Sequence, residues 1–275
     1  MPTIPPKDPI TAGTASGQWG DLSARVMSGA AMAVVGVVAI VLGGVWFQML
    51  AVFVTAVMVW ELWMMISPEA PTPGMLLAAL VASVMSGQLH VGPSPALALF
   101  FVVPLIGAWA VRYERVTFFV FALGIQLAGW GLVTFRSEFG FTWLLWLVLV
   151  VIVTDIAGYF AGRTFGGPKF WPKVSPKKTW SGTVAGWLGA GLVGLGFMIV
   201  TNAGASIIPI SMALSLASQM GDIAESALKR RMHVKDSSAL IPGHGGLFDR
   251  FDALLGASLF MLAVAFLLDV PGVAF

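Results

Sequence analysis

The stretch Glu225–Asp252, ESALKRRMHVKDSSALIPGHGGLFDRFD, concentrates ionisable side chains in a chain that is otherwise strongly apolar. From Asp222 to Asp252 there are ten charged residues, two of the three histidines and a Gly-His-Gly-Gly turn. Apolar runs long enough to cross a membrane lie on both sides of it. Because a charge at mid-depth in a bilayer costs about 2.5–3.5 kcal/mol on insertion scales, this cluster indicates a membrane protein that keeps its charges for chemistry.

The composition supports the same class. Of the 275 residues, 58% are hydrophobic and only 10% are charged, whereas a soluble domain carries about 25% charged residues. We therefore expect an all-α, polytopic integral membrane protein. The absence of cysteine excludes disulfides, thiolate metal sites and cysteine nucleophiles. Residues 1–25 are polar and rich in Pro, Gly and Thr, and we expect them to form a flexible tail.

Apolar runs close to the roughly 20 residues that cross a bilayer predict about nine transmembrane helices. They cover about residues 26–43, 45–66, 75–90, 94–111, 116–134, 141–160, 181–201, 206–228 and 248–270. We divide them into an N-terminal transmembrane region, residues 26–134, and a C-terminal catalytic transmembrane region, residues 135–275.

The basic residues predict the orientation, because cytoplasmic segments collect Lys and Arg. With a cytoplasmic N-terminus, 14 of the 15 basic residues fall on the cytoplasmic side, and only Arg136 lies elsewhere. The two most basic segments, 161–180 and 229–247, are too short to form domains with cores of their own. An active site is therefore expected at the cytoplasmic membrane interface, built from loops and span ends.

Polar residues inside the predicted spans narrow the location of that site. One stripe of a helix, at spacings i, i+3, i+4 and i+7, is formed by Asp222, Glu225, Ser226 and Lys229. A second polar pair, Asp155 and Tyr159, stands at i and i+4, although Asp155 could instead serve as an interhelical hydrogen-bonding group. Nearby, the glycines at 158 and 162 form a step of small residues that would let another helix approach closely.

Other ionisable residues have a plainer interpretation. Glu61, near an aromatic-rich span end, is interpreted as structural or interfacial and is placed outside the site. His90 and His233 are interpreted as structural.

The segment SPKKTWSG, residues 175–182, leads into the seventh predicted span. Thr179 or Ser181 can cap that helix, and Lys177 and Lys178 stand beside its first amides. Amide donors and the helix dipole both favour an anion at this position, so the segment suits a phosphate. The alternative is that the two lysines only follow the positive-inside rule.

Asp222 and Asp249 come from two different predicted helix ends, and a basic loop separates them. Magnesium is usually held by one or two carboxylates together with substrate phosphates, and neighbouring cations stabilise the charge of a transferring phosphoryl group. The glycines around His244, at positions 243, 245 and 246, permit positive φ and a close backbone approach. The pattern therefore predicts a site for magnesium and phosphate.

These motifs resemble the phosphatidate cytidylyltransferases, also called CDP-diacylglycerol synthases. The 27 residues from Ser226 onward resemble the family signature. They share with it Ser226, Leu228, Lys229, Arg230, Lys235, Asp236, Pro242, His244, Gly245, Gly246, Asp249, Arg250 and Asp252. Upstream, a second family segment is matched by Asp155, Gly158, Tyr159, Gly162 and Arg163, and the family's SPKKT loop by residues 175–179. One departure is Ser181, where the family pattern has Glu.

The resemblance implies that CTP and phosphatidic acid react to give CDP-diacylglycerol and pyrophosphate, a step of phospholipid biosynthesis. The implied cofactor is Mg²⁺, and a second monovalent or divalent cation is left open. It implies catalytic roles for Asp222, Asp249, Lys229 and Arg230. It implies substrate binding by Ser175, Lys177, Lys178, Thr179, Ser226, Lys235, Asp236, His244, Gly245, Gly246 and Arg250. The expected metal ligands are Asp222 and Asp249, with Asp252 and Asp155 as weaker candidates.

The expected location is the bacterial inner membrane. No nucleic-acid partner is expected, and the sequence leaves open whether the protein forms a homodimer. Three alternatives were weighed against this interpretation. A CTP-dependent lipid kinase would share the magnesium chemistry but transfer the γ-phosphate. A transporter would place its polar groups near the bilayer midplane, usually within internal repeats. A purely structural membrane scaffold leaves the charged cluster between residues 222 and 252 unexplained.

Overall fold

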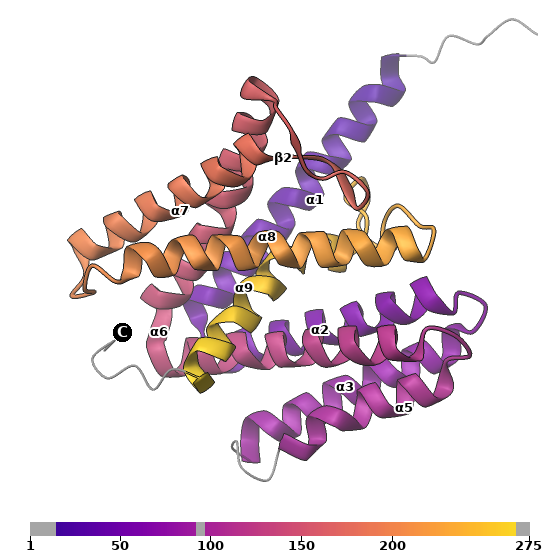
Figure 1. The fold of residues 1–275 in the computed structure, drawn as a ribbon. Helices are drawn as coiled ribbons and strands as arrows, with labels where there is room; N and C mark the ends of the chain where they lie inside the picture. Colours follow the sequence, from indigo (N-terminus) through magenta and orange to yellow (C-terminus); the bar gives the residue numbers. More distant parts are fainter. Residues whose placement is uncertain (1–14, 92–96, 268–275) are drawn as a thin grey trace, which may run out of the picture.

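Long apolar runs fold as helices throughout the computed structural model, which describes residues 15–91 and 97–267 (Figure 1). The helices are α1 (Ala15–Leu42), α2 (Gly44–Ile66), α3 (Pro71–Val91), the 3-10 helix η1 (Leu97–Phe101), α5 (Val102–Ala110), α6 (Arg115–Phe165), α7 (Trp180–Val200), α8 (Ile207–Arg231) and α9 (Phe248–Leu267). Two short strands, β1 (Lys169–Trp171) and β2 (Ser175–Thr179), stand between α6 and α7.

Within the described ranges, five helices are long and apolar enough to cross a membrane. These are α2, α3 as far as His90, α6, α7 and α8. Shorter apolar helices cover Val26–Leu42 and Ala98–Ala110. An all-α integral membrane protein is thus confirmed, whereas the count of nine spans stays a prediction.

The structure differs from the expected boundaries in two places. Helix α1 begins at Ala15, so residues 15–25 are helical and not a flexible tail, while residues 1–14 lie outside the described part. The predicted spans 116–134 and 141–160 are the two helical halves of the segment labelled α6, as predicted, but the break between them lies at residue 140. Its two halves meet at a kink at Gly140 (φ 84°, ψ −173°), a conformation open to glycine. The division we predicted between residues 134 and 135 therefore falls inside a helix.

A β-hairpin, which the all-α expectation did not include, precedes α7. Its strands are antiparallel, with Lys169 opposite Thr179 and Trp171 opposite Ser175. Successive side chains of a strand point to opposite faces, and accordingly Lys177 is exposed while its neighbour Lys178 is partly buried. Thr179 ends the hairpin and caps α7, because its hydroxyl accepts a hydrogen bond from the amide of Gly182 (3.3 Å). Thr179, one of the two predicted caps, is confirmed.

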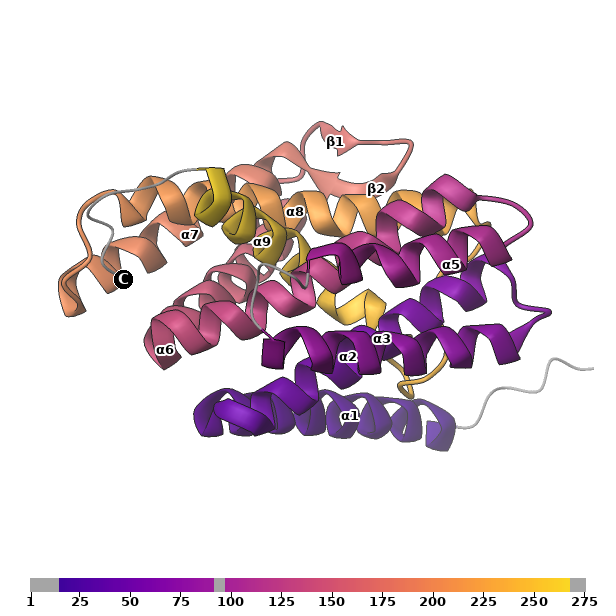
Figure 2. The same ribbon diagram turned by 90° about the horizontal axis from the view of Figure 1, so that it is seen from below.

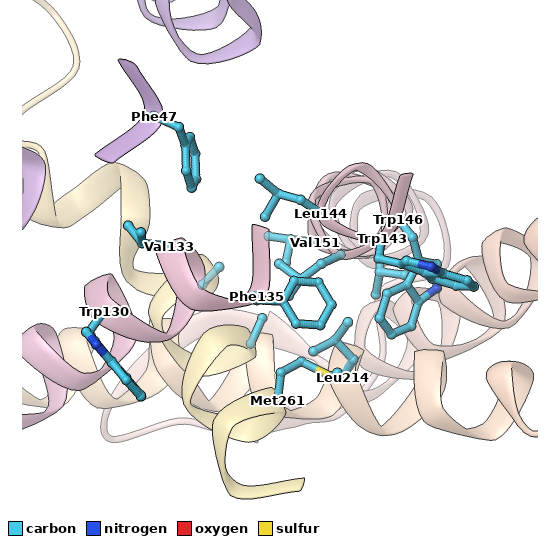
Figure 3. Packing of buried hydrophobic residues seen from close by; sticks show 14 of the residues in the cluster. Phe47, Trp130, Val133, Phe135, Trp143, Leu144, Trp146, Val151, Leu214 and Met261 are labelled. Carbon is cyan, nitrogen blue, oxygen red and sulfur yellow. The ribbon is translucent and has the colours of Figure 1, made fainter. Parts of the chain in front are cut away.

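Buried apolar side chains fill the spaces between the helices in two clusters. One joins α6, α8 and α9 through residues such as Trp146, Leu147, Leu214 and Ala257 (Figure 3). The other lies where α2, α3, α5 and the first half of α6 meet, and it also contains Phe248 from the start of α9. Both views of the ribbon show the hairpin, the end of α8 and the turn after α2 toward the same side of the bundle (Figures 1 and 2).

Glycines bring the polar helices together at that side. A Cβ on Gly158 of α6 would lie 3.3 Å from the carbonyl oxygen of Gly182 of α7, so the close approach predicted for residue 158 is confirmed. Helices α8 and α9 cross in the same way at Gly221 and Gly256, where the backbones touch. Asp222 directly follows Gly221, and Asp252 lies one helical turn before Gly256. The crossing of the two helices therefore places these two carboxylates near one another.

Replacement of Gly256 by Ala is expected to destabilise the protein by about 1–3 kcal/mol, because the added methyl group collides with the backbone of α8. Thermal unfolding in detergent measures the effect. Gly196→Ala in α7 is the matched control, since a Cβ there meets no atom within 4 Å, and it should be neutral or slightly stabilising. A Gly256→Ala variant as stable as the control would contradict this account of the crossing.

Candidate active site

Lys178 of the hairpin contacts α8. Its ammonium lies 2.6 Å from Oδ2 of Asp222 and within 3.5 Å of the carbonyl oxygen of Gln219. The other oxygen of Asp222 accepts a hydrogen bond from Ser226 one turn later (3.2 Å). The SPKKT strand and the polar stripe of α8, which are about 40 residues apart in the sequence, thus form one site.

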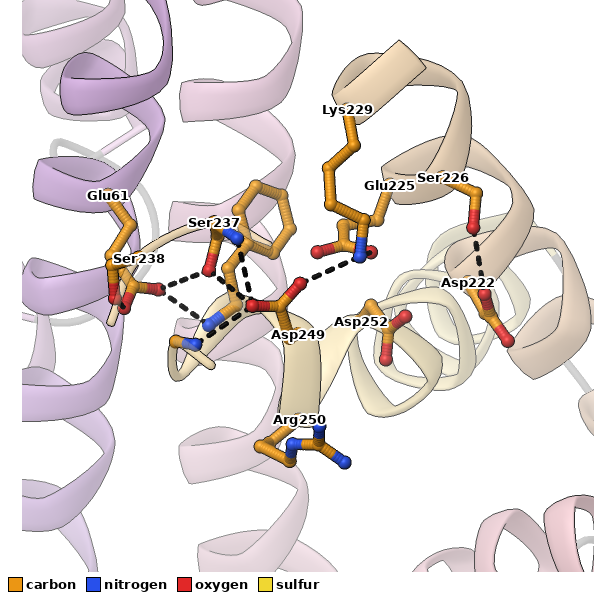
Figure 4. A network of polar contacts seen from close by, with 12 residues as sticks. Glu61, Asp222, Glu225, Ser226, Lys229, Ser237, Ser238, Asp249, Arg250 and Asp252 are labelled. Atoms are coloured by element: carbon orange, nitrogen blue, oxygen red, sulfur yellow. Dashed lines mark hydrogen bonds and ion pairs between the residues drawn. The ribbon is translucent and has the colours of Figure 1, made fainter. Parts of the chain in front are cut away.

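Lys229 links α8 to α9. Its ammonium forms ion pairs with Glu225 on the same helix and with Oδ1 of Asp249 (2.7 Å) at the start of α9 (Figure 4). The lysine is largely buried between these two carboxylates. Since charge-assisted hydrogen bonds are stronger than neutral ones, these contacts fix the end of α8 against the start of α9.

Asp249 organises the loop between α8 and α9. Its Oδ2 accepts hydrogen bonds from the amide of Ser237 (2.9 Å), the hydroxyl of Ser237 (3.0 Å) and the amide of Gly246 (2.8 Å). Gly245 has φ +80°, and a Cβ on it would lie 2.7 Å from that oxygen. Protein donors therefore contact both oxygens of Asp249, as they do both oxygens of Asp222, but Asp249 makes four such contacts and Asp222 makes two. The metal ligation that we predicted for the two aspartates stays a prediction.

Glu61, which we interpreted as structural or interfacial and placed outside the site, lies directly beside the loop that carries the site residues. Within the part of the chain that the structure describes, the fully buried carboxylate of Glu61 accepts its hydrogen bonds from residues of this loop and the start of α9. At Oε1 the donors are Ser238 Oγ (2.6 Å) and the Leu247 amide (2.9 Å), and at Oε2 they are the Phe248 amide (2.7 Å) and Ser237 Oγ (3.2 Å). A carboxylate in an apolar helix needs such donors. The position of Glu61 in an apolar span was therefore the one sign in the sequence that polar partners had to lie near it.

The glycine turn around His244 forms the outer part of the site. Of the three glycines for which the sequence allowed positive φ, Gly243 and Gly245 have it and Gly246 does not. Arg250 donates two hydrogen bonds to the carbonyl oxygen of His244 (2.9 and 2.7 Å). The hydroxyl of Ser28 in α1 lies 2.8 Å from Nδ1 of His244. Arg250 and α1 therefore hold the turn in place.

Three carboxylates lie in the region between α6, α8 and α9. Asp155, Asp222 and Asp252 are close enough to repel one another electrostatically. Among the described residues, no three His, Cys, Asp or Glu side chains are gathered closely enough to hold a metal ion by themselves. Magnesium commonly takes one or two carboxylates and completes its shell with water and substrate phosphates. Asp222 and Asp252, with Asp155 beside them, fit that form of binding.

Some of the predicted site residues take no part in the ion pairs of Lys178 and Lys229. The exposed ones are Lys177, Arg230, Lys235 and Asp236, and Ser175 is partly buried at the start of β2. Arg230 follows Lys229 directly, so it projects about 100° away from it around the helix. At Ser181, where the family pattern has Glu, the hydroxyl donates to the carbonyl oxygen of Gly166. These residues surround the ion-paired centre without contributing to its internal bonds.

Comparison with known proteins places this chain in a family. Residues 23–268 match the Cytidylyltransferase family. The phosphatidate cytidylyltransferase of Brucella suis is 41% identical over 161 residues, which cover 57% of this chain and 60% of the relative. The phosphatidate cytidylyltransferase of Bacillus subtilis is 38% identical over 43% of this chain and 45% of the relative. That of Staphylococcus aureus is 32% identical over 66% of this chain and 75% of the relative.

The matched region thus spans about 60% of the length of the Brucella suis relative. The family match covers most of this chain, including the hairpin, the stripe of α8 and the loop before α9. The chain belongs to the Cytidylyltransferase family.

Proposed function

We propose that the protein is a phosphatidate cytidylyltransferase, which transfers CMP from CTP to phosphatidic acid and releases pyrophosphate. The observation that carries the proposal is the joining of Lys178–Asp222 and Lys229–Asp249 in one polar site at the ends of apolar helices. A lipid phosphate can reach such a position from the membrane, and a nucleotide from water. Family membership and the printed names of the relatives support the same reaction.

In the proposed reaction an oxygen of the lipid phosphate attacks the α-phosphorus of CTP. The new P–O bond forms as the bond from the α-phosphorus to the bridging oxygen of the β-phosphate breaks, and that electron pair leaves with pyrophosphate. Because the attacking phosphate is already anionic at neutral pH, it needs little help from a general base. The work of the protein is therefore positioning and neutralisation of charge.

Two partly buried lysines, Lys178 and Lys229, supply that neutralisation. Lys178 and Lys229 each hold a positive charge beside carboxylates, so they are fixed before substrate arrives. The exposed Lys177 and Arg230 would attract the triphosphate and the lipid phosphate from outside. Asp222 and Asp252, with Asp155, would hold Mg²⁺, which supplies further stabilisation of charge on the phosphates when it is bound.

We further propose that the site faces the cytoplasm across a bacterial inner membrane, with nine crossings in total. Counting α6 as two crossings on either side of Gly140, the helices alternate so that α2, α6 and α8 end where α7 and α9 begin. The basic residues concentrate at that side, as the positive-inside rule requires of a cytoplasmic face.

The function is tested with purified protein in detergent, phosphatidic acid and CTP carrying label in its α-phosphate. We expect labelled CDP-diacylglycerol on thin-layer chromatography, and no product after EDTA treatment until Mg²⁺ is restored. CTP labelled in its γ-phosphate should leave the lipid unlabelled. Labelled lipid in this second reaction would indicate a CTP-dependent kinase and would contradict the proposal.

Asp222 and Asp249 should respond differently to substitution, because we assign one to the metal and the other to the loop. Asp222→Asn is expected to raise the Mg²⁺ concentration for half-maximal rate by at least about tenfold. Asp249→Asn should lower kcat by about 10- to 100-fold through its lost charge-assisted bonds, with little change in Mg²⁺ requirement. Magnesium titrations of both variants test these expectations. A raised Mg²⁺ requirement in Asp249→Asn, with none in Asp222→Asn, would assign the metal to Asp249 and the loop to Asp222.

The orientation can be tested without activity because the chain has no cysteine. Leu240→Cys lies in the loop before α9, and Asn202→Cys lies in the turn between α7 and α8; both positions are exposed. An impermeant maleimide added to intact cells should label position 202 only, and position 240 only after the membrane is opened. Labelling of position 240 from outside would place the site away from CTP.

A further inference from the structure

Glu61 joins two parts of the chain that are far apart in sequence. It lies in α2, 176 residues before Ser237, and its carboxylate is fully buried. Its four hydrogen-bond donors among the described residues all belong to residues 237–248. A buried carboxylate without donors is strongly destabilising. The loop therefore stabilises the Glu61 carboxylate, and Glu61 in turn holds the loop.

Two of these donors are at the N-terminus of α9. The first amides of a helix have no partner within the helix, and they form the positive end of its dipole. The amides of Leu247 and Phe248 point at Glu61, which therefore caps α9 from another helix. Because Asp249 is the next residue, the cap also fixes the backbone that carries the Asp249 carboxylate.

Gly246 shows how tightly Glu61 fits. A Cβ on this residue would collide with the Glu61 carboxylate and with the hydroxyl of Ser237. Gly246 also donates its amide to Asp249 (2.8 Å). The glycine therefore lets a short stretch of backbone pass between two carboxylates, one from α2 and one from α9.

Ser237 transmits the position of Glu61 to the lysine. Its hydroxyl lies 3.2 Å from Glu61 and 3.0 Å from Asp249, while its amide donates to Asp249. The other oxygen of Asp249 holds Lys229. Figure 4 shows these residues as one continuous series from α2 to α8.

We propose that Glu61 is a positioning residue of the active site: it fixes residues 237–248 and thereby sets where Asp249 holds Lys229. It acts through the loop and touches no substrate. The activity readout of this inference rests on the proposed function, whereas the fixing of the loop can be measured without it.

Glu61→Gln tests the inference because it keeps the size of the side chain. The new amide group is itself a donor, and whichever oxygen it replaces faced one backbone amide and one serine hydroxyl. The hydroxyl can turn to accept from it, but the hydrogen bond from the backbone amide is lost. We expect kcat to fall by about 10- to 100-fold, the effect of a small displacement of catalytic groups. Thr55→Ala is the matched control: Thr55 is buried on the same helix and donates to the carbonyl of Ala51 in that helix. It should stay within about twofold of wild type.

A double variant separates positioning through the loop from general destabilisation. If Glu61 acts through Ser238 and its neighbours, Ser238→Ala combined with Glu61→Gln should lower kcat no further than Glu61→Gln alone, because the shared bond is lost once. Two independent effects would multiply. A multiplied loss would therefore contradict the inference.

Limited trypsin digestion measures the loop directly, whatever the activity. Cleavage after Lys235, which is exposed, should become at least about threefold faster in Glu61→Gln and stay unchanged in Thr55→Ala, because the loop opens more often. Unchanged cleavage together with wild-type kcat would overturn the inference. If the wild-type protein makes no CDP-diacylglycerol, the proposed function fails, and the digestion alone decides the role of Glu61.

The Ser237→Ala, Ser238→Ala double variant takes the place of Glu61→Gln if that variant does not accumulate. It removes both hydroxyl donors from the loop and leaves the buried carboxylate with its two backbone donors. The same loss of kcat and the same faster cleavage are expected. Wild-type values for both would overturn the inference.

Discussion

Ionisable groups placed among apolar helices need partners, because an unpaired buried charge is strongly destabilising. In this protein that constraint is met by a series of contacts from Glu61 through the loop to Asp249, Lys229 and Glu225. The loop is irregular and rich in glycine, yet carboxylates accept hydrogen bonds from its Ser237, Gly246 and Leu247 amides. The rest of the site depends on this arrangement, since it fixes the ends of α8 and α9 relative to α2.

The charged residues divide into two groups with different surroundings. Lys178 and Lys229 are held by carboxylates and have fixed positions, whereas Lys177, Arg230 and Lys235 are exposed. A fixed charge costs little reorganisation when negative charge develops nearby, and exposed charges increase the rate at which anions arrive. This division accounts for the density of basic residues in a chain that otherwise avoids charge.

Much of the fold followed from apolar length, because a helix is the simplest way to satisfy backbone groups in a membrane. The place at which α6 changes direction did not, because it is set by a single glycine at position 140. The hairpin was missed because β1 has only three residues. Within the site, helical spacing predicted the stripe of α8. Glu61 could not be assigned, because its partners lie 176 or more residues away.

The central claim is that phosphate chemistry takes place at the ion-paired site between β2, α8 and α9. The most direct test is an experimental structure with Mg²⁺ and a CTP analogue that cannot be cleaved at its α-phosphate. The account predicts the triphosphate beside Lys178 and Lys229, with Asp222 near the metal. A triphosphate bound instead in the cavity lined by Gln48, Arg136 and Ser137, where the chain has its one basic residue outside the predicted cytoplasmic segments, would contradict it.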